Sequence, residues 1–210
     1  MNSEITQTDV LDLPYQIILD LDDERYSSQA QDLVRLFKND VDNDGNVDNL
    51  DLGKALATVK AQPNLAIIGT INSSYKQSKK ALVALVQGIA ETVARAGALA
   101  LSGENNAFND VLTKVFGNLK EQEGKPWFKI ASGAGGRTGK TVYTYNLFYI
   151  SHSPSTGGLL SATLLSCRVS IDASIKDLLG HDDEDKVDIK YEKYQVETEI
   201  KGLSLIKPVD

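Results

Sequence analysis

The sequence has few of the residues on which covalent cross-linking and acid–base catalysis depend, with one cysteine and two histidines among 210 residues. A single cysteine excludes an internal disulfide, and the apolar neighbours of Cys167 predict a buried, unreactive thiol. His152 and His181 stand in predicted surface loops, and no serine, cysteine or carboxylate lies at a spacing from them that is typical of catalysis. We therefore expect a protein that is not an enzyme.

Positive charge is also scarce, because 22 lysines and arginines stand against 29 aspartates and glutamates and give a net charge of -7. Binding to nucleic acid requires clustered basic side chains, and those of this chain are scattered, so no nucleic-acid partner is expected. Residues 1–13 form a polar tail without the basic and apolar segments of a secretory signal. We expect a chain that is soluble in the producing cell and leaves it without a recognisable signal peptide.

Residues 141–171 predict a long β-hairpin around which the rest of the chain is organised. Two runs rich in β-branched and aromatic residues flank a turn of Ser, Pro and Gly at residues 152–158. Both arms carry bulky side chains at odd and even positions, as expected of central strands that are covered on both faces. A sheet of this kind needs two outer layers, and the segments upstream have the periodicity of amphipathic helices.

The upstream segments predict two helical hairpins, over about residues 27–60 and 75–120. The length of the chain suits one domain, which we place at residues 14–206. The other predicted segments are a strand at 14–21, an apolar strand at 64–72, strands over about 126–206 and a tail at 207–210.

Residues 81–101 form an apolar run that is long enough to cross a bilayer. Glu91 and Arg95 lie inside this run, and each charge makes spanning unfavourable by roughly 2.5 to 3.5 kcal/mol. Together with Gln87 they recur every four residues and form one narrow polar stripe. We therefore predict an amphipathic helix that covers the sheet rather than a transmembrane helix.

Residues 40–51, DVDNDGNVDNLD, fit the spacing of an EF-hand calcium loop. Calcium takes about six to eight hard oxygen ligands, and Gly45 provides the sharp turn that such a loop needs. The last position holds an aspartate where EF-hands usually have a glutamate. The alternative interpretation is a solvated acidic loop between two helices. The predicted calcium ligands are Asp40, Asp42, Asp44, Asn46, through its backbone carbonyl, Asp48 and Asp51.

Residues 134–141, AGGRTGKT, satisfy a relaxed phosphate-loop pattern. A phosphate loop must open a helix, because the helix N-terminus binds the anion. The residues after Lys140 are strongly strand-forming instead, and Ala134 replaces the first glycine. We therefore predict a glycine-rich connection between two strands, with a nucleotide-hydrolysing enzyme as the weakest alternative.

Several short motifs stand in the C-terminal half in a distinctive order and spacing. They are WF at 127–128, TYNLF at 144–148, STG at 155–157 and YQVETEIKGLSL at 194–205. In this order they resemble the Cyt family of cytolytic δ-endotoxins, to which the fungal volvatoxin-type cytolysins are related. The helical half agrees in layout and contains VQGIAETV at 86–93, so that the resemblance covers residues 14–206.

The resemblance implies a three-layer α/β/α single domain, with a largely antiparallel central sheet wrapped by the two helical hairpins. It also implies a toxin that acts directly on membrane phospholipids of target cells and forms pores or disrupts the bilayer. Homodimers in solution and homo-oligomers on membranes are expected partners. The calcium loop and the short tail before Pro14 depart from the family pattern.

A sheet with apolar residues on both faces can stay in water only while helices cover it, so displacing a helical layer would expose strands to lipid. The alternative is a calcium-stabilised, non-enzymatic binding module on the same fold, in which the same residues are core. In either case we expect bound calcium to hold the two helices of the first helical hairpin together and so to stabilise it. The residues expected to face lipid are Leu147, Phe148, Tyr149 and Ile150 on one arm of the hairpin and Leu159, Leu160, Leu164 and Leu165 on the other.

Overall fold

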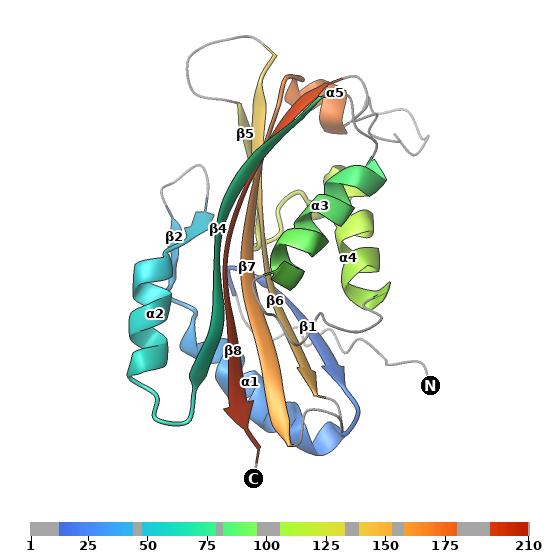
Figure 1. Cartoon of the computed structure of the whole chain (residues 1–210). Helices are drawn as coiled ribbons and strands as arrows, with labels where there is room; N and C mark the ends of the chain where they lie inside the picture. The colour runs from blue at the N-terminus through green and yellow to red at the C-terminus, as the bar shows by residue number, and fades with distance from the viewer. Residues whose placement is uncertain are drawn as a thin grey trace.

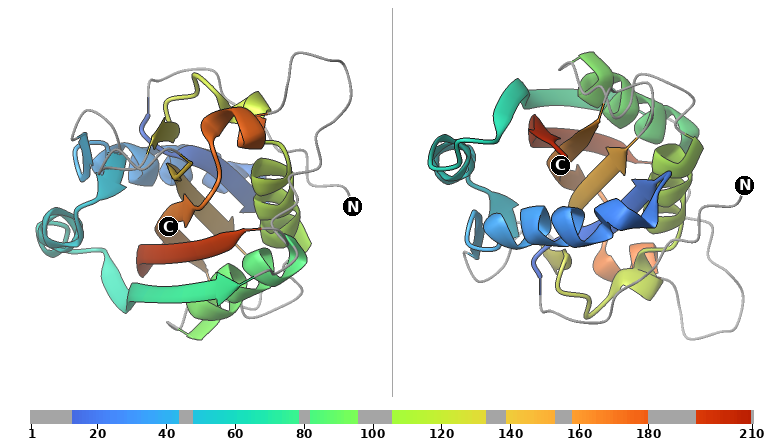
Figure 2. Two further views of the ribbon diagram at one scale, coloured as in Figure 1. Left: turned by 90° about the horizontal axis from the view of Figure 1, so that it is seen from above. Right: turned by 90° about the horizontal axis from the view of Figure 1, so that it is seen from below.

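The computed structural model describes residues 13–43, 48–78, 82–95, 106–132, 139–152, 158–179 and 194–209. Within these ranges the chain forms three layers, with a twisted sheet between two sets of helices (Figure 1). The views along the strands show the two helical sets on opposite sides of the sheet (Figure 2). The predicted three-layer architecture is therefore confirmed.

The central sheet is largely antiparallel, as predicted. Its strands run in the order β1-β6-β7-β8-β4, and β5 also pairs with β6. The pairing of β1 with β6 is parallel, whereas the other pairings are antiparallel. The strands are β1 (Gln16–Leu21), β4 (Ala66–Ser78), β5 (Phe128–Ser132), β6 (Thr141–His152), β7 (Leu159–Ile171) and β8 (Gln195–Pro208). The predicted hairpin is the pair β6–β7, which lies in the middle of the sheet.

One face of the sheet is covered by α1 (Ser27–Leu36) and α2 (Leu52–Lys60), which are separated in sequence by a small antiparallel hairpin of β2 (Val41–Asn43) and β3 (Asp48–Leu50). The other face is covered by α3 (Leu82–Arg95) and α4 (Asn106–Gly117), which contact each other. Shorter helices are η1 (Glu24–Tyr26), η3 (Leu119–Gln122) and α5 (Ile175–Leu179).

The helices form where the apolar spacing predicts them and bury that stripe. Helix α1 places Ala30, Leu33 and Val34 in the core, and α3 does the same with residues that include Leu85 and Ile89. No helix in the described parts of the chain is both long and apolar enough to cross a membrane. Glu91 and Arg95 of the predicted polar stripe form an ion pair at 3.4 Å on the exposed side of α3.

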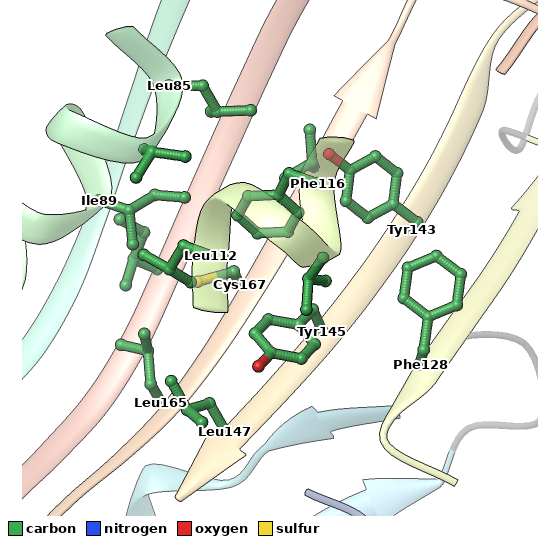
Figure 3. Packing of buried hydrophobic residues seen from close by; sticks show 14 of the residues in the cluster. Leu85, Ile89, Leu112, Phe116, Phe128, Tyr143, Tyr145, Leu147, Leu165 and Cys167 are labelled. Atoms are coloured by element: carbon green, nitrogen blue, oxygen red, sulfur yellow. The ribbon is translucent and has the colours of Figure 1, made fainter. Parts of the chain in front are cut away.

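Each face of the sheet carries its own buried cluster, because successive side chains of a strand point to opposite faces. The cluster under α3 and α4 contains Tyr143, Tyr145 and Leu147 of β6 (Figure 3). Tyr149 of the same strand also belongs to it. The cluster under α1 and α2 contains the alternate residues of the same strand, Phe148 and Ile150. The expectation that β6 is covered on both faces is confirmed.

The start of the second helical hairpin, predicted at residue 75, is wrong. Strand β4 continues to Ser78, and α3 begins at Leu82. Tyr75 pairs with Thr198 on β8 and packs against the cluster under α3 and α4, so tertiary pairing overrides the local helical pattern. At the other end of the chain β8 extends to Pro208, two residues into the predicted tail.

His152 is not the surface residue that we predicted. It is the last residue of β6, is buried, and packs against Tyr26 with ring centroids 4.2 Å apart and the rings tilted by 38°. Several other predictions fall on segments outside the described residues. These are the part of the predicted helix at 96–101, the turn at 153–157, His181 and the part of the predicted strand region at 180–193.

Candidate membrane-active sheet and cation site

The eight predicted lipid-facing residues lie on the adjacent strands β6 and β7, where the antiparallel register pairs Leu147 with Leu165 and Phe148 with Leu164. Seven of them are at most 1% exposed, and Leu159 is half-buried. The structure divides the set between the two faces of the sheet. Leu147, Tyr149 and Leu165 lie under α3 and α4, whereas Phe148, Ile150, Leu160 and Leu164 lie under α1 and α2.

The face under α3 and α4 is apolar from Tyr143 to Tyr149 along β6, and it carries Ser151, Ser161 and Thr163 at the far end. Tyr143, Tyr145 and Leu147 of β6 lie beside Cys167 of the neighbouring strand β7 (Figure 3). Val169 of β7, which pairs with Tyr143, belongs to the same cluster. Helix α4 packs aromatic rings against this face, with Phe116 5.7 Å from Tyr145 and Phe108 5.9 Å from Tyr149 between ring centroids.

The hydroxyls of Tyr145 and Tyr149 on this face point to the edge strand β1. Tyr145 donates to Oε1 of Gln16, and Tyr149 donates to Oδ2 of Asp20, both at 2.7 Å. Burial raises the pKa of both tyrosines above the ordinary value, and the Asp20 carboxylate raises that of Tyr149 further. Both hydroxyls therefore stay protonated in the folded protein.

The face under α1 and α2 is apolar at one end only. Towards the start of β6 it carries Thr144 and Asn146, and the paired residues on β7 and β8 are Ser166, Arg168 and Glu199. Arg168 pairs with Glu199 at 3.3 Å, and Asn146 donates its amide to the carbonyl of Pro14 at 3.1 Å. The two faces of the sheet therefore differ in polarity, although both are covered.

The ends of the predicted calcium loop meet at the base of the β2–β3 hairpin. The N–H of Asp51 donates to the carbonyl oxygen of Asp40 at 2.8 Å. Asp51 is also the N-cap of α2, since its Oδ1 accepts from the N–H of Lys54 at 3.0 Å. The segment thus forms a β-hairpin, and α2 begins directly after it, at Leu52.

The ammonium group of Lys54 lies among the carboxylates at this base. It forms an ion pair with Asp42, and its Nζ is 3.8 Å from Oδ2 of Asp51. The Asp42 carboxylate raises the pKa of Lys54, and the N–H of Lys54 lowers the pKa of Asp51. Lys54 was not among the residues predicted from the sequence, although its position three residues after Asp51, in the first turn of α2, is a usable signal.

Asp40 is the buried member of this group, at 5% exposure. Burial raises the pKa of its carboxyl, an effect that a hydrogen bond with Thr58 opposes. Its Oδ2 has no hydrogen-bond partner among the described residues. No three His, Cys, Asp or Glu side chains converge as metal ligands in the parts of the chain that the structure describes. The side chains of Asp44, Asn46 and Asp48 lie outside the described residues.

The phosphate-loop alternative is not supported by the local fold. Lys140 directly precedes β6, and no helix begins there. A helix N-terminus would have to follow this lysine to bind a phosphate group. Strands β5 and β6 stand on either side of this segment, as predicted for a connection between two strands. Residues 133–138 of the connection lie outside the described ranges.

Comparisons with known proteins agree with this architecture. A family model described as Bacillus thuringiensis toxin matches residues 5–210. The type-2Aa cytolytic delta-endotoxin of Bacillus thuringiensis subsp. kyushuensis is 24% identical over 189 residues, which are 87% of this chain and 67% of that protein.

Two solved structures share the fold. The activated Cyt2Ba monomer from Bacillus thuringiensis subsp. israelensis has a TM-score of 0.76 at 20% identity, covering 94% of this chain and 99% of that one. A structure described as a delta-endotoxin has a TM-score of 0.80 at 20% identity, covering 100% of this chain and 88% of that one. The central, mostly antiparallel sheet between helices is common to all three chains.

Proposed function

The chain belongs to the Bacillus thuringiensis toxin family, whose Cyt delta-endotoxins are membrane-disrupting cytolytic toxins, and from this we propose that it permeabilises membranes by exposing one face of its central sheet. Membership of this family favours the toxin over the calcium-stabilised binding module. The target of the sheet is the phospholipid bilayer itself, so neither a receptor nor an enzymatic step is required.

The observation that carries this proposal is the difference in polarity between the two faces. Strands that cross a bilayer present apolar side chains to lipid on one face and tolerate polar ones on the other. The face under α3 and α4 fits lipid, whereas the opposite face carries Arg168 and Glu199. We therefore infer that α3 and α4 leave the sheet, and that Leu147, Tyr149 and Leu165 contact lipid.

The dimensions of the hairpin suit this role. A tilted strand crosses the hydrocarbon core with about 9 to 11 residues, and β6 and β7 have 12 and 13. Unpaired strand edges cannot remain in lipid, because each unsatisfied backbone group costs several kcal/mol. Among the described strands β4 pairs with β8 alone, so its outer edge would pair with another copy in a membrane assembly. A homodimer in solution would precede that assembly.

The same mechanism also indicates how the protein passes from the producing cell to the target cell. With its helices in place the apolar faces are covered, which suits a form that is soluble in the producing cell. We propose release without a signal peptide and action at the membrane of the target cell.

The experiment that tests the function is release of an entrapped dye from zwitterionic liposomes, before and after limited proteolysis and with calcium or chelator. Release in any of these conditions is the expected result. Vesicles that stay sealed throughout, with no protein sedimenting with them, would overturn membrane action and favour the binding module.

A further inference from the structure

A polar pocket of about 180 Å³ lies at the open end of the β6–β7 hairpin, opposite its turn. At this end of the sheet β4 finishes and β8 begins, next to α5 (Figure 1). A water molecule takes up roughly 30 Å³ in the liquid, so the pocket has room for a small polar molecule. The polar side chains around it are Lys76, Lys140, Ser170, Asp172, Gln195 and Glu197.

The charged side chains of this pocket come from neighbouring strands. The register pairs Lys76 of β4 with Glu197 of β8, and Glu197 with Ser170 of β7. The alternation of side chains along a strand places these three residues on the face whose other end lies under α1 and α2. Lys140 and Asp172 lie one residue beyond the last pair of β6 and β7, so they stand at the mouth of the hairpin.

The four charges of the pocket are balanced but not all paired. Nζ of Lys76 lies 3.3 Å from Oε1 of Glu197. Lys140 and Asp172 form no ion pair with any residue that the structure describes. The pocket therefore has zero net charge, with one ammonium and one carboxylate left for a ligand.

This balance of charge selects the chemistry of the ligand. The carboxylates of Asp172 and Glu197 repel a simple anion, and the two lysines repel a simple cation. A zwitterion complements both poles. A lysine binds phosphate well, and the Ser170 hydroxyl can donate a further hydrogen bond to a phosphate oxygen.

The cationic end of the ligand can be specified further. A quaternary ammonium is usually recognised by aromatic rings that surround it. The described residues around this pocket include no aromatic ring, whereas they offer carboxylates as acceptors. A primary ammonium, which donates hydrogen bonds, therefore fits better than choline.

We propose that this pocket binds a phosphoethanolamine head group, with its phosphate at Lys140 and its ammonium at Asp172. The head group belongs to a membrane phospholipid or to a free phosphodiester. The lipid source rests on the proposed function, because a hairpin that enters a bilayer turn first leaves its open end at the level of the head groups.

The test is calorimetric titration of the full chain with glycerophosphoethanolamine, which carries this head group without acyl chains. Lys140→Gln and Asp172→Asn should each weaken binding by at least about tenfold, because each removes a charged hydrogen-bond partner. Lys176→Gln removes an exposed lysine of α5 that does not line the pocket, and it should leave the affinity unchanged. Unchanged melting temperatures show that the variants are folded.

Three results would overturn the site. They are absence of binding to the wild-type protein, equal affinity for inorganic phosphate, and equal affinity for glycerophosphocholine. The second result would mean that an anion is sufficient, and the third that the ammonium is not recognised. A loss of affinity in Lys176→Gln equal to that in Lys140→Gln would also contradict it, since general screening of charge would then explain both.

Sedimentation with phosphatidylcholine vesicles, with and without phosphatidylethanolamine, identifies the source of the head group. Greater sedimentation with phosphatidylethanolamine, reduced several-fold in Lys140→Gln, is expected for a lipid. Binding of glycerophosphoethanolamine without this increase would overturn the lipid source. Dye release is measured in parallel, because head-group binding without release would contradict the proposed function alone, and release without head-group binding would contradict this site alone.

Discussion

The phenolic hydroxyl of Tyr149 in β6 donates a 2.7 Å hydrogen bond to Oδ2 of Asp20 in β1. Together with the bond from Tyr145 to Gln16, it ties the N-terminal strand to the central hairpin, with which β1 pairs in parallel. Both tyrosine rings belong to the cluster under α3 and α4. The edge of the sheet is therefore held by side chains that lie on the face we expect to meet lipid.

We predict that Tyr149→Phe lowers the free energy of unfolding by about 1 to 3 kcal/mol at pH 7, because a hydrogen bond to a carboxylate is lost. Burial, and secondarily Asp20, raises the folded pKa of this tyrosine above its unfolded value. The stability that this group contributes is therefore complete below the unfolded pKa of about 10 and is lost as pH rises above it. Urea unfolding at pH 7 and at pH 10.5 measures both effects.

Between pH 7 and pH 10.5, Tyr149→Phe should lose less free energy of unfolding than the wild-type protein, because it has no phenolic hydroxyl to deprotonate. Tyr26→Phe, which changes a less buried tyrosine, is the control and should behave like the wild-type protein. An equal loss of stability with pH in wild type and Tyr149→Phe would contradict the assignment of this residue.

We predict that Leu85→Ala destabilises the protein by about 2 to 5 kcal/mol, because it leaves a cavity under α3. Val83 on the same helix is 60% exposed, so Val83→Ala should change the free energy of unfolding by no more than about 0.5 kcal/mol. Urea unfolding provides the comparison.

The same variant distinguishes the two helical layers in a leakage assay. If α3 and α4 must leave the sheet, Leu85→Ala should release dye several-fold faster than the wild-type protein. Leu33→Ala truncates a comparably buried side chain on α1 and should not accelerate dye release. Faster release by Leu33→Ala alone would show that the other layer departs.

The elements that depend on local sequence pattern could be predicted from the sequence. The β6–β7 hairpin was evident because its arms are rich in β-branched and aromatic residues, and the bounds of α2 follow from the Asp51 cap and from Pro63. The run of β4 past Tyr75 was not evident, because it depends on pairing with β8, about 120 residues away in the sequence.

The candidate site was harder to predict from the sequence, because it too depends on pairing between segments that are distant in the chain. The membrane residues were identified as apolar, but their division between two faces depends on the register of Leu147 with Leu165. His152 was placed in a loop because turn-forming residues follow it, whereas the structure ends β6 on it beneath Tyr26. The role of Lys54 emerges only when the β2–β3 hairpin brings Asp42 back to the start of α2.

We predict that Gly202→Ala lowers the free energy of unfolding by about 1 to 3 kcal/mol through overpacking. A Cβ atom on this residue of β8 would lie 2.9 Å from Cδ1 of Ile71 and 3.1 Å from the carbonyl oxygen of Leu164. The second contact is with backbone and cannot be relieved by a side-chain rotation. Gly124→Ala has no atom within 4 Å of its new Cβ but has a φ of +77°, so it tests strain without crowding.

The residues that touch lipid can be identified with a phospholipid that carries a photoreactive group in its acyl chain. Because the face under α3 and α4 is the more apolar one, we predict adducts on Leu147, Tyr149 and Leu165 after vesicle binding and illumination. The neighbouring residues Phe148 and Leu164 point to the opposite face and should remain unlabelled.

Mass spectrometry of the digested protein distinguishes these residues by their alternation along β6 and β7. Protein illuminated with free photoreactive lipid below the concentration that forms vesicles is the control and should carry no adducts on either strand, because both faces are then covered. Labelling confined to Phe148 and Leu164 would mean that α1 and α2 leave instead. Labelling of α3 and α4 with an unlabelled sheet would mean that helices rather than strands enter the bilayer, which would contradict the mechanism drawn from the polarity of the two faces.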